Sequence, residues 1–237
     1  MLFLHERHEI RAGAGPEFEA AYRDEWMPRL ARADDARLIW YWRHANASSR
    51  PNNIVTITAV KSAAALGRLS ESLQGGDFAQ FAASLDPLRH QVVSSVLAPT
   101  RFSELNEIDF ASVPADPKQR HARAMYVEDV VWPPSLDDYV AMAGENWYRP
   151  AAAGTGKVRA RITHPAFFQV AYGAGVRPEV YLIQKLIDPP EMFVRNLLAT
   201  DYPPEMKAPD HYFVRGLKVR DQWESRIMAT SEWSPLD

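Results

Sequence analysis

Cysteine is absent from this chain of 237 residues. Its absence excludes disulfides, thiolate nucleophiles, cysteine-ligated zinc and iron–sulfur clusters. An excess of basic residues is also missing, because 27 Lys and Arg stand against 30 Asp and Glu, a formal net charge of -3. Nucleic-acid binding normally needs a basic face. We therefore expect no nucleic-acid partner.

Long apolar runs are missing as well. The N-terminus becomes charged from residue 5 onward, whereas a signal peptide needs an apolar run of about 7–15 residues. No stretch approaches the roughly 18–20 apolar residues of a membrane span. These features predict a cytoplasmic protein with no membrane partner. Glycine-rich nucleotide loops and the Gly-x-Ser-x-Gly motif do not occur, which disfavours nucleotide-dependent and serine-hydrolase chemistry.

What the first half does contain is an alternation of strand-like and helix-like segments. Residues with period-two or β-branched patterns predict strands, and apolar residues at helical spacing predict helices. The predicted strands are 2–11, 37–45, 54–60 and 96–102, and the predicted helices are 17–30, 63–73 and 78–93. The order β-α-β-β-α-β, with one extra helix before the last strand, is that of a ferredoxin-like unit.

The second half repeats this order. Its predicted strands are 124–132, 167–172, 180–187 and 227–233, and its predicted helices are 136–147, 190–199 and 211–220. Residues 109–121 carry two prolines and little apolar content, which is typical of a linker. We therefore predict two ferredoxin-like domains, 1–108 and 122–237, joined by a linker at 109–121.

Matching positions in the two halves support a duplication. Trp26 and Trp147 are 121 residues apart, the second and third strands are 126 apart, and Thr100 and Thr230 are 130 apart. An offset that only grows is what a repeated unit with a few insertions shows.

A four-stranded ferredoxin-like sheet has helices on one face only, so its other face must be covered. Packing two such sheets face to face solves this problem within one chain. The predicted fold is α+β: two ferredoxin-like domains in tandem, with their sheets packed face to face as an intrachain dimeric α+β barrel.

Two stretches resemble a known family. Glu6 to Gly13, followed by Phe18, resembles the opening strand and turn of NIPSNAP-like proteins. Residues 25–30, before the strand at 38–42, resemble that family's helix end and second strand. These proteins belong to the dimeric α+β barrel (ferredoxin-like) superfamily, and some are tandem repeats. The resemblance is clearest over residues 2–60, although Ala12 replaces the usual proline and His8 a common tyrosine.

The resemblance implies a small-molecule enzyme without a bound organic cofactor. Such barrels run lyase, isomerase or cyclase, and cofactor-independent monooxygenase reactions on apolar or aromatic substrates. The alternative is a non-catalytic NIPSNAP-type module that binds a ligand or another protein. Some relatives of this barrel bind haem through one histidine, and His164 or His211 could serve here. A small molecule is the expected partner, and a homodimer stays open.

Period-two geometry sorts the first strand into two faces. Glu6 and His8 share one face, and His5 lies on the other with Arg7. A carboxylate and an imidazole two residues apart could transfer protons, so Glu6 and His8 are candidate catalytic residues, together with Asp129 of the matching strand. The alternative is a structural ion pair or exposure at a rim. His5 and His8 cannot share a metal ion because they lie on opposite faces, and we expect no metal site.

Repeated aromatic residues could form the walls of a site for a flat or apolar ligand, with plain core packing as the alternative. Arg161 lies in a basic, glycine-bearing stretch within residues 149–165, which could be a binding loop or a solvated surface loop. The candidate substrate-binding residues are Trp26, Trp40, Trp42, His44, Tyr126, Glu128, Trp147, Arg161 and His164.

Overall fold

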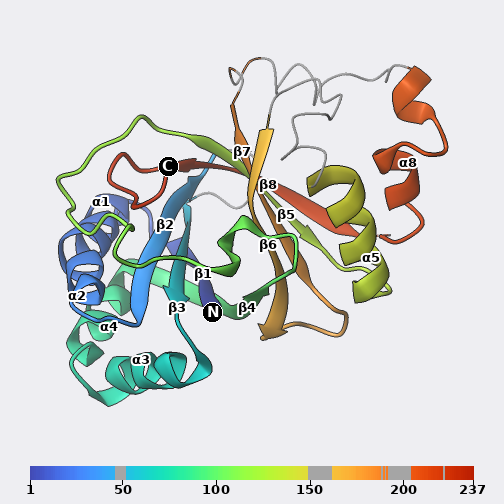
Figure 1. Ribbon diagram of the computed structural model, residues 1–237. Coiled ribbons are helices and arrows are strands. Elements are labelled where there is room, and N and C mark those ends of the chain that lie inside the picture. Colours follow the sequence, from blue (N-terminus) through green and yellow to red (C-terminus); the bar gives the residue numbers. More distant parts are fainter. Residues whose placement is uncertain (46–51, 149–161, 188, 190, 192–203, 221) are drawn as a thin grey trace.

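The structure is a computed structural model that describes all residues except 46–51, 149–161, 188, 190, 192–203 and 221. Its strands close into one antiparallel barrel in the order β1-β3-β2-β8-β5-β7-β6-β4 (Figure 1). The strands are β1 (Leu2–Ile10), β2 (Ala36–His44), β3 (Asn53–Val60), β4 (Arg89–Pro99), β5 (Met125–Val131), β6 (Ile162–Tyr172), β7 (Val180–Leu186) and β8 (Trp223–Thr230).

Each half contributes its strands in the same spatial order. The first four are arranged β4-β1-β3-β2 and the last four β8-β5-β7-β6, so β1 and β5 are each flanked by two strands of their own half. Two seams join the halves, because β2 pairs with β8 and β4 pairs with β6. The predicted mixed fold with an antiparallel barrel is confirmed. Closure leaves the described barrel without an unpaired edge strand, which removes a route to aggregation.

Helices cover the outside of the barrel on two sides (Figure 1). In the first half they are α1 (Gly15–Ala21), the π-helix η1 (Tyr22–Trp26), α2 (Met27–Ala31), α3 (Ala63–Gly75), α4 (Ala79–Leu85) and the 3-10 helix η2 (Asp86–Leu88). From residue 104 onward the described helices are the 3-10 helix η3 (Glu104–Asn106), α5 (Leu136–Ala143), the π-helix η4 (Gly144–Tyr148), the 3-10 helix η5 (Pro204–Lys207) and α8 (Tyr212–Gly216).

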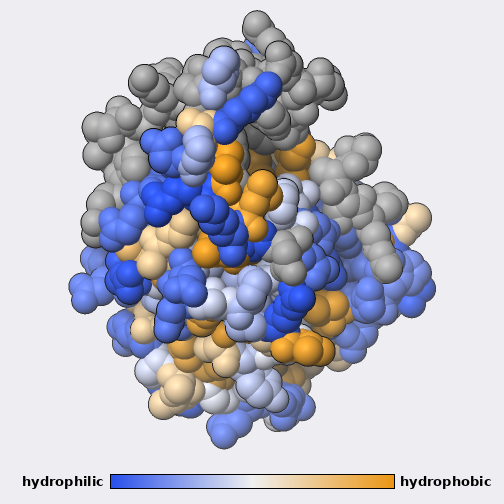
Figure 2. Space-filling view, turned by 90° about the vertical axis from the view of Figure 1, so that its right-hand side faces the viewer, coloured by the Kyte–Doolittle hydropathy of each residue, from blue (hydrophilic) through white to orange (hydrophobic). Residues whose placement is uncertain are grey.

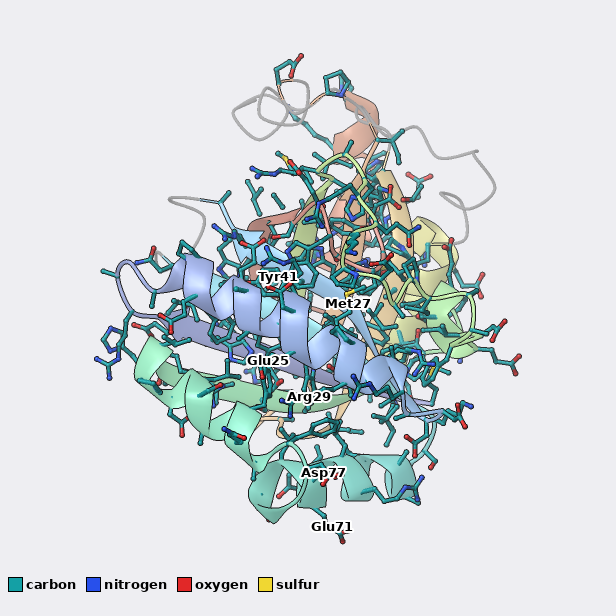
Figure 3. The ribbon with its side chains drawn as sticks, turned by 90° about the vertical axis from the view of Figure 1, so that its left-hand side faces the viewer. Glu25, Met27, Arg29, Tyr41, Glu71 and Asp77 are labelled. Atoms are coloured by element: carbon teal, nitrogen blue, oxygen red, sulfur yellow. The ribbon has the colours of Figure 1, made fainter. Side chains whose placement is uncertain are left out.

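Figure 3 shows α1, η1 and α2 as one continuous rod across the first-half sheet, with α3 and α4 beside it. Charged residues lie on the outer side of this rod: the Arg29 guanidinium donates to the Glu25 carboxylate at 3.1 Å and to the Asp77 carbonyl at 3.2 Å. Within the described ranges, no helix combines the length and the apolar character needed to cross a membrane.

Local signals set the helix starts. Gly13 has a φ of 84° in the turn after β1, a backbone region that glycine adopts without a steric penalty. Pro16 then lies in the first turn of α1, where its missing N–H is not needed. Ser62 and Ser135 cap α3 and α5 by accepting a hydrogen bond from a backbone N–H of the first turn. Such caps typically contribute about 1 kcal/mol each.

Side chains that alternate along the strands form three packed regions. Phe3 points into the barrel, where it packs in a core cluster with Trp40, Trp42 and Tyr126. Ile10 points outward and packs against the first-half helices, and a third cluster lies between the second-half sheet and α5 with α8. We call the two outer regions the N-terminal layer and the C-terminal layer.

The predicted helix at 78–93 is wrong beyond Leu88, because β4 begins at Arg89. This stretch pairs with β1 as far as Ile10 and Arg89, so the ladder satisfies backbone groups that a helix would otherwise have to satisfy. The last strand also lies earlier than the predicted 227–233, and α8 is shorter than the predicted 211–220. The predicted helix at 190–199 lies outside the described residues, apart from Glu191.

Residues 109–121 contain neither helix nor strand, yet they do not lie free of the barrel. Phe110 and Val113 are 4% and 5% exposed and belong to the cluster inside the barrel. Arg37 and Lys61 place their cationic groups 5.7 and 5.6 Å from the centre of the Phe110 ring. The stretch therefore packs into one end of the barrel.

Because Phe110 is buried there, we expect Phe110→Ala to lower the free energy of unfolding by about 3 kcal/mol through lost burial and a cavity. Urea denaturation of the intact chain measures this, with Val176→Ala as a control, since Val176 is fully exposed. A loss below about 1 kcal/mol would mean that residues 109–121 act only as a linker.

Candidate functional site

His8 lies in the N-terminal layer, and both of its ring nitrogens have partners. Nδ1 is 3.1 Å from the Arg89 guanidinium, which can only donate, so Nδ1 accepts. Nε2 then carries the proton and lies 3.1 Å from the Tyr22 hydroxyl and 3.3 Å from that of Thr56. Burial, with Arg89 adding to it, moves the pKa of His8 well below its ordinary value. This histidine is neutral and fully hydrogen-bonded, as a structural residue would be.

Glu6 projects into the same layer, as the strand pattern predicted. Its carboxylate accepts a 3.4 Å hydrogen bond from the Ser94 hydroxyl. Burial raises the pKa of Glu6, and the Arg89 charge opposes this. In the part of the chain that the structure describes, no hydrogen bond or ion pair joins Glu6 to His8, so the expected carboxylate–imidazole pair does not form.

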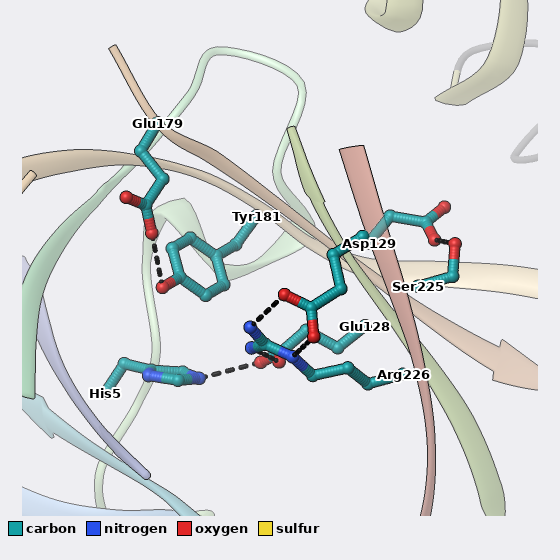
Figure 4. Close-up of polar contacts among 8 residues, drawn as sticks. His5, Glu128, Asp129, Glu179, Tyr181, Ser225 and Arg226 are labelled. Atoms are coloured by element: carbon teal, nitrogen blue, oxygen red, sulfur yellow. Dashed lines mark hydrogen bonds and ion pairs between the residues drawn. The ribbon is translucent and has the colours of Figure 1, made fainter. Parts of the chain in front are cut away.

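The interior of the barrel holds a buried ionic cluster (Figure 4). His5 Nε2 of β1 lies 2.7 Å from Glu128 Oε1 of β5. Arg226 of β8 donates to Glu128 Oε2 at 2.8 Å and holds both oxygens of Glu224 at 3.0 and 2.8 Å. Burial opposes the charge of Glu128, but His5 and Arg226 together hold the pKa of Glu128 far below its ordinary value. The cluster joins the two halves across the barrel.

Five of the candidate substrate-binding residues face this interior. The rings of Trp40 and Trp42 stack at 4.8 Å, and the Tyr126 ring lies 5.1 Å from that of Trp42. His44 follows Trp42 on the same face of β2, and burial lowers the pKa of His44 to about 4. Glu128 completes the five. The rings of Trp40, Trp42 and Tyr126 are buried and contact one another.

Asp129 points the other way, into the C-terminal layer. It accepts hydrogen bonds from the Ser225 hydroxyl and, at 2.6 Å, from the Gln184 amide. The Trp147 indole N–H donates to the Gln184 carbonyl oxygen at 3.3 Å. Burial raises the pKa of Asp129, because it outweighs these hydrogen bonds and the charge of Arg220. A carboxyl group that is harder to ionise than usual is suited to exchange protons.

His164 lies in the C-terminal layer and is 3% exposed. Its ring lies 5.4 Å from that of Trp147 and 4.6 Å from that of Tyr148. Neither of its nitrogens has a hydrogen-bond partner in the described structure. Burial lowers the pKa of His164 to about 4, so the ring is neutral near pH 7, with one free donor and one free acceptor.

Arg220 is the residue of this layer that the sequence did not reveal. It is 7% exposed, and its guanidinium lies over the rings of Tyr212 and Trp223 at 5.4 and 4.6 Å. Among the described residues it forms no ion pair, and its Nε has no acceptor. An arginine so buried normally has an anionic partner, because an unpaired buried charge is costly.

Apolar surface is exposed near this arginine. Trp223 is 44% exposed and Leu217 is 62% exposed. Figure 2, which views the side of α5 and α8, shows apolar atoms between hydrophilic ones. Apolar surface of this kind is common where ligands approach a protein.

The structure therefore divides the predicted site residues among three places. Asp129, Trp147 and His164 come together through hydrogen bonds and ring contacts in the C-terminal layer. Trp26 lies in the N-terminal layer with Glu6 and His8, and the remaining described candidates line the barrel interior. Arg161 lies outside the described residues, and His211 precedes α8. The described ranges hold no group of three or more His, Asp or Glu able to bind a metal ion.

Neither a family model nor a curated protein matches the chain. Solved structures do match. An anthrone oxidase-like protein aligns over 97% of this chain and 91% of its own, with 12% identity and a TM-score of 0.56. The protein named "Putative monooxygenase" from Fusobacterium nucleatum aligns over the same shares, with 7% identity and a TM-score of 0.57. The chain shares the fold of these proteins, and identities this low show the fold alone.

A NIPSNAP domain protein from Burkholderia xenovorans is 26% identical but covers only 43% of this chain, with a TM-score of 0.37. The match takes in 97% of that protein's own length. The NIPSNAP resemblance is thus limited to part of the chain.

Glu128 and Asp129 are adjacent acids whose pKa values are shifted in opposite directions. Their contributions to stability should therefore depend on pH in opposite ways. Glu128 has a lowered pKa, so its contribution is present above the unfolded pKa of about 4.3 and is lost as the pH falls below it. Near pH 7, we expect Glu128→Gln to cost about 3–5 kcal/mol, because it breaks a buried ion pair. This cost should shrink as the pH falls below about 4.

Asp129 has a raised pKa, so it makes folding less favourable as the pH rises through its folded pKa. The free energy of unfolding of Asp129→Asn, relative to that of the wild type, should therefore be higher at pH 7 than at pH 3. Urea denaturation from pH 3 to 7 measures both variants. Parallel pH profiles for Glu128→Gln and Asp129→Asn would contradict the opposite environments of the two acids.

Proposed function

We propose that this protein is a small-molecule enzyme that performs acid–base chemistry in the C-terminal layer. The observation that carries the proposal is a contrast between the two layers. In the N-terminal layer, His8 and Arg89 contact each other and Arg89 also holds Asp86. In the C-terminal layer, His164 has no hydrogen-bond partner and Arg220 no ion pair among the described residues. Buried groups of this kind call for a ligand or an ordered water.

The roles follow from the side chains. Asp129 takes a proton from the substrate, since its environment already favours the protonated carboxyl. The negative charge left on a substrate oxygen lies near the Arg220 guanidinium, which stabilises it. His164 remains neutral and fixes the orientation of a polar group through its free donor and acceptor. A substrate with an acidic O–H or C–H group suits this arrangement.

Aromatic rings define the substrate class. The rings of Trp147 and Tyr212 stack at 4.7 Å, and those of Tyr148 and Phe167 at 4.6 Å. Walls of this composition favour flat, apolar or aromatic molecules. The names of two structural neighbours, an anthrone oxidase-like protein and a monooxygenase, support an oxygenase acting on such substrates ahead of a lyase or an isomerase.

We also propose that the two halves are tandem copies of one ferredoxin-like domain, 1–108 and 122–237. Trp26 and Trp147 both lie in π-helices that follow the first helix of their half. Each indole N–H donates to β3 or β7: Trp26 to Thr58 at 3.4 Å and Trp147 to Gln184 at 3.3 Å. Each ring also stacks on one aromatic ring, at 5.0 and 4.7 Å respectively. Shared contacts of this detail support a common origin.

Replacing the proton-transferring group tests the function. The assay is oxygen consumption and product analysis with a panel of anthrones and naphthols. We expect Asp129→Asn to lower kcat by about 100-fold or more, as loss of a general base does. The wild-type kcat/KM should rise with pH through the pKa of Asp129, because the base must be ionised.

The matched control is Glu6→Gln, which removes a partly buried carboxylate with a raised pKa from the other layer. Its kcat should stay within about twofold of the wild type. Equal activity of Asp129→Asn and the wild type would refute the assignment. If no member of a broad panel turned over, the non-catalytic binding module would be the better account.

We further propose that the enzyme works without a bound organic cofactor. The rings of Trp147 and Tyr148 flank His164 closely, which leaves this histidine poorly placed as a haem ligand. We expect the purified protein to show no Soret absorption. A Soret band that disappears in His164→Ala would replace this proposal with a haem protein.

A further inference from the structure

A second set of polar groups without partners among the described residues lies inside the barrel, on the opposite face of the sheet from Asp129. Arg7 of β1 and Trp42 of β2 both pair with Val55 of β3, so the three form one row across the inner face. The Trp42 indole N–H and both nitrogens of His44 have no hydrogen-bond partner among the described residues. His44 lies on the same face as Trp42, two residues further along the strand.

Arg7 is the unpaired cation of this set. Glu128 and Glu224 are both held by Arg226. Glu179 accepts hydrogen bonds from the Tyr181 hydroxyl at 2.7 Å and the Trp132 indole at 3.2 Å. Each of these carboxylates therefore has its own donors. Arg7 has no ion pair in the part of the chain that is described, although it is close enough to His44 and Glu224 to influence their pKa values.

Solvent reaches the barrel beside Arg7. Val93, which pairs with Arg7 across β1 and β4, is 46% exposed. The Glu224 side chain is 44% exposed. The other end of the barrel is closed by Phe110 and Val113, as described above. Among the described residues, the end of the barrel at Arg7 is therefore the open one.

We infer that the barrel interior carries a second ligand site, which takes a small organic carboxylate. The Arg7 guanidinium can donate to both carboxylate oxygens. The Trp42 indole N–H and one nitrogen of the neutral His44 supply further donors, while the stacked Trp40 and Trp42 rings face the apolar part of the ligand. Three donors that lack acceptors match a ligand rich in acceptor oxygens. This site is separate from the C-terminal layer and does not depend on the proposed reaction.

Benzoate and its neutral isostere benzamide test the inference. Isothermal titration calorimetry on the intact protein should show benzoate binding about tenfold or more tightly than benzamide, the effect of one charge-assisted contact. Arg7→Gln should remove this preference. Arg32→Gln makes the same chemical change at an exposed helix end and should leave benzoate binding unchanged.

Two further variants locate the ligand. Trp42→Phe keeps an aromatic ring but removes the indole N–H, so it should weaken benzoate binding. Asp129→Asn should leave benzoate binding unchanged. The inference is overturned if the wild type binds no benzoate at millimolar concentration, or if Arg7→Gln binds it as well as the wild type does. Benzoate binding that depends on Arg220 instead of Arg7 would also overturn it, while leaving the proposed function intact. Retained thermal stability of Arg7→Gln confirms that lost binding is not lost folding.

Discussion

A closed barrel needs partners for the charges that it buries, and Glu128 finds its partners in His5 and Arg226. Glu128 is completely buried, and an isolated carboxylate there would be very costly. His5 comes from the first half of the chain, whereas Glu128 and Arg226 come from the second. Both oxygens of the carboxylate are therefore paired only when the two halves meet in register. This requirement links assembly of the barrel to its electrostatics.

The same requirement separates structural polar groups from functional ones. Where a buried group has protein partners, as His8 has, the fold alone explains it. Where it has none among the described residues, as with His164, the folded state is less stable than it could be, and function is the usual reason for such a cost. The C-terminal layer combines a hard-to-ionise carboxyl, an arginine with no ion pair in the described part of the chain, and aromatic walls. The N-terminal layer has aromatic residues too, but its histidine, His8, and its arginine, Arg89, are hydrogen-bonded to each other.

Local periodicity was enough to predict much of this. The two faces of β1, the opposite directions of His5 and His8, and the matched positions of Trp26 and Trp147 all follow from short-range patterns. Local patterns cannot show which face of the sheet carries the site. Arg220 comes from a short turn after α8, and its surroundings depend on elements far away in the sequence. The burial of Phe110 was equally hidden, because a single phenylalanine ahead of two prolines, in a stretch with little apolar content, is typical of a linker.

The central claim is that the C-terminal layer is incomplete without a bound molecule. The most direct measurement is a high-resolution crystal structure of the protein as purified, with electron density examined around His164 and Arg220. We expect density that belongs to no protein atom and lies within hydrogen-bond distance of both side chains. The claim is contradicted if His164 and Arg220 are found bonded to protein groups, with side chains filling the space between them.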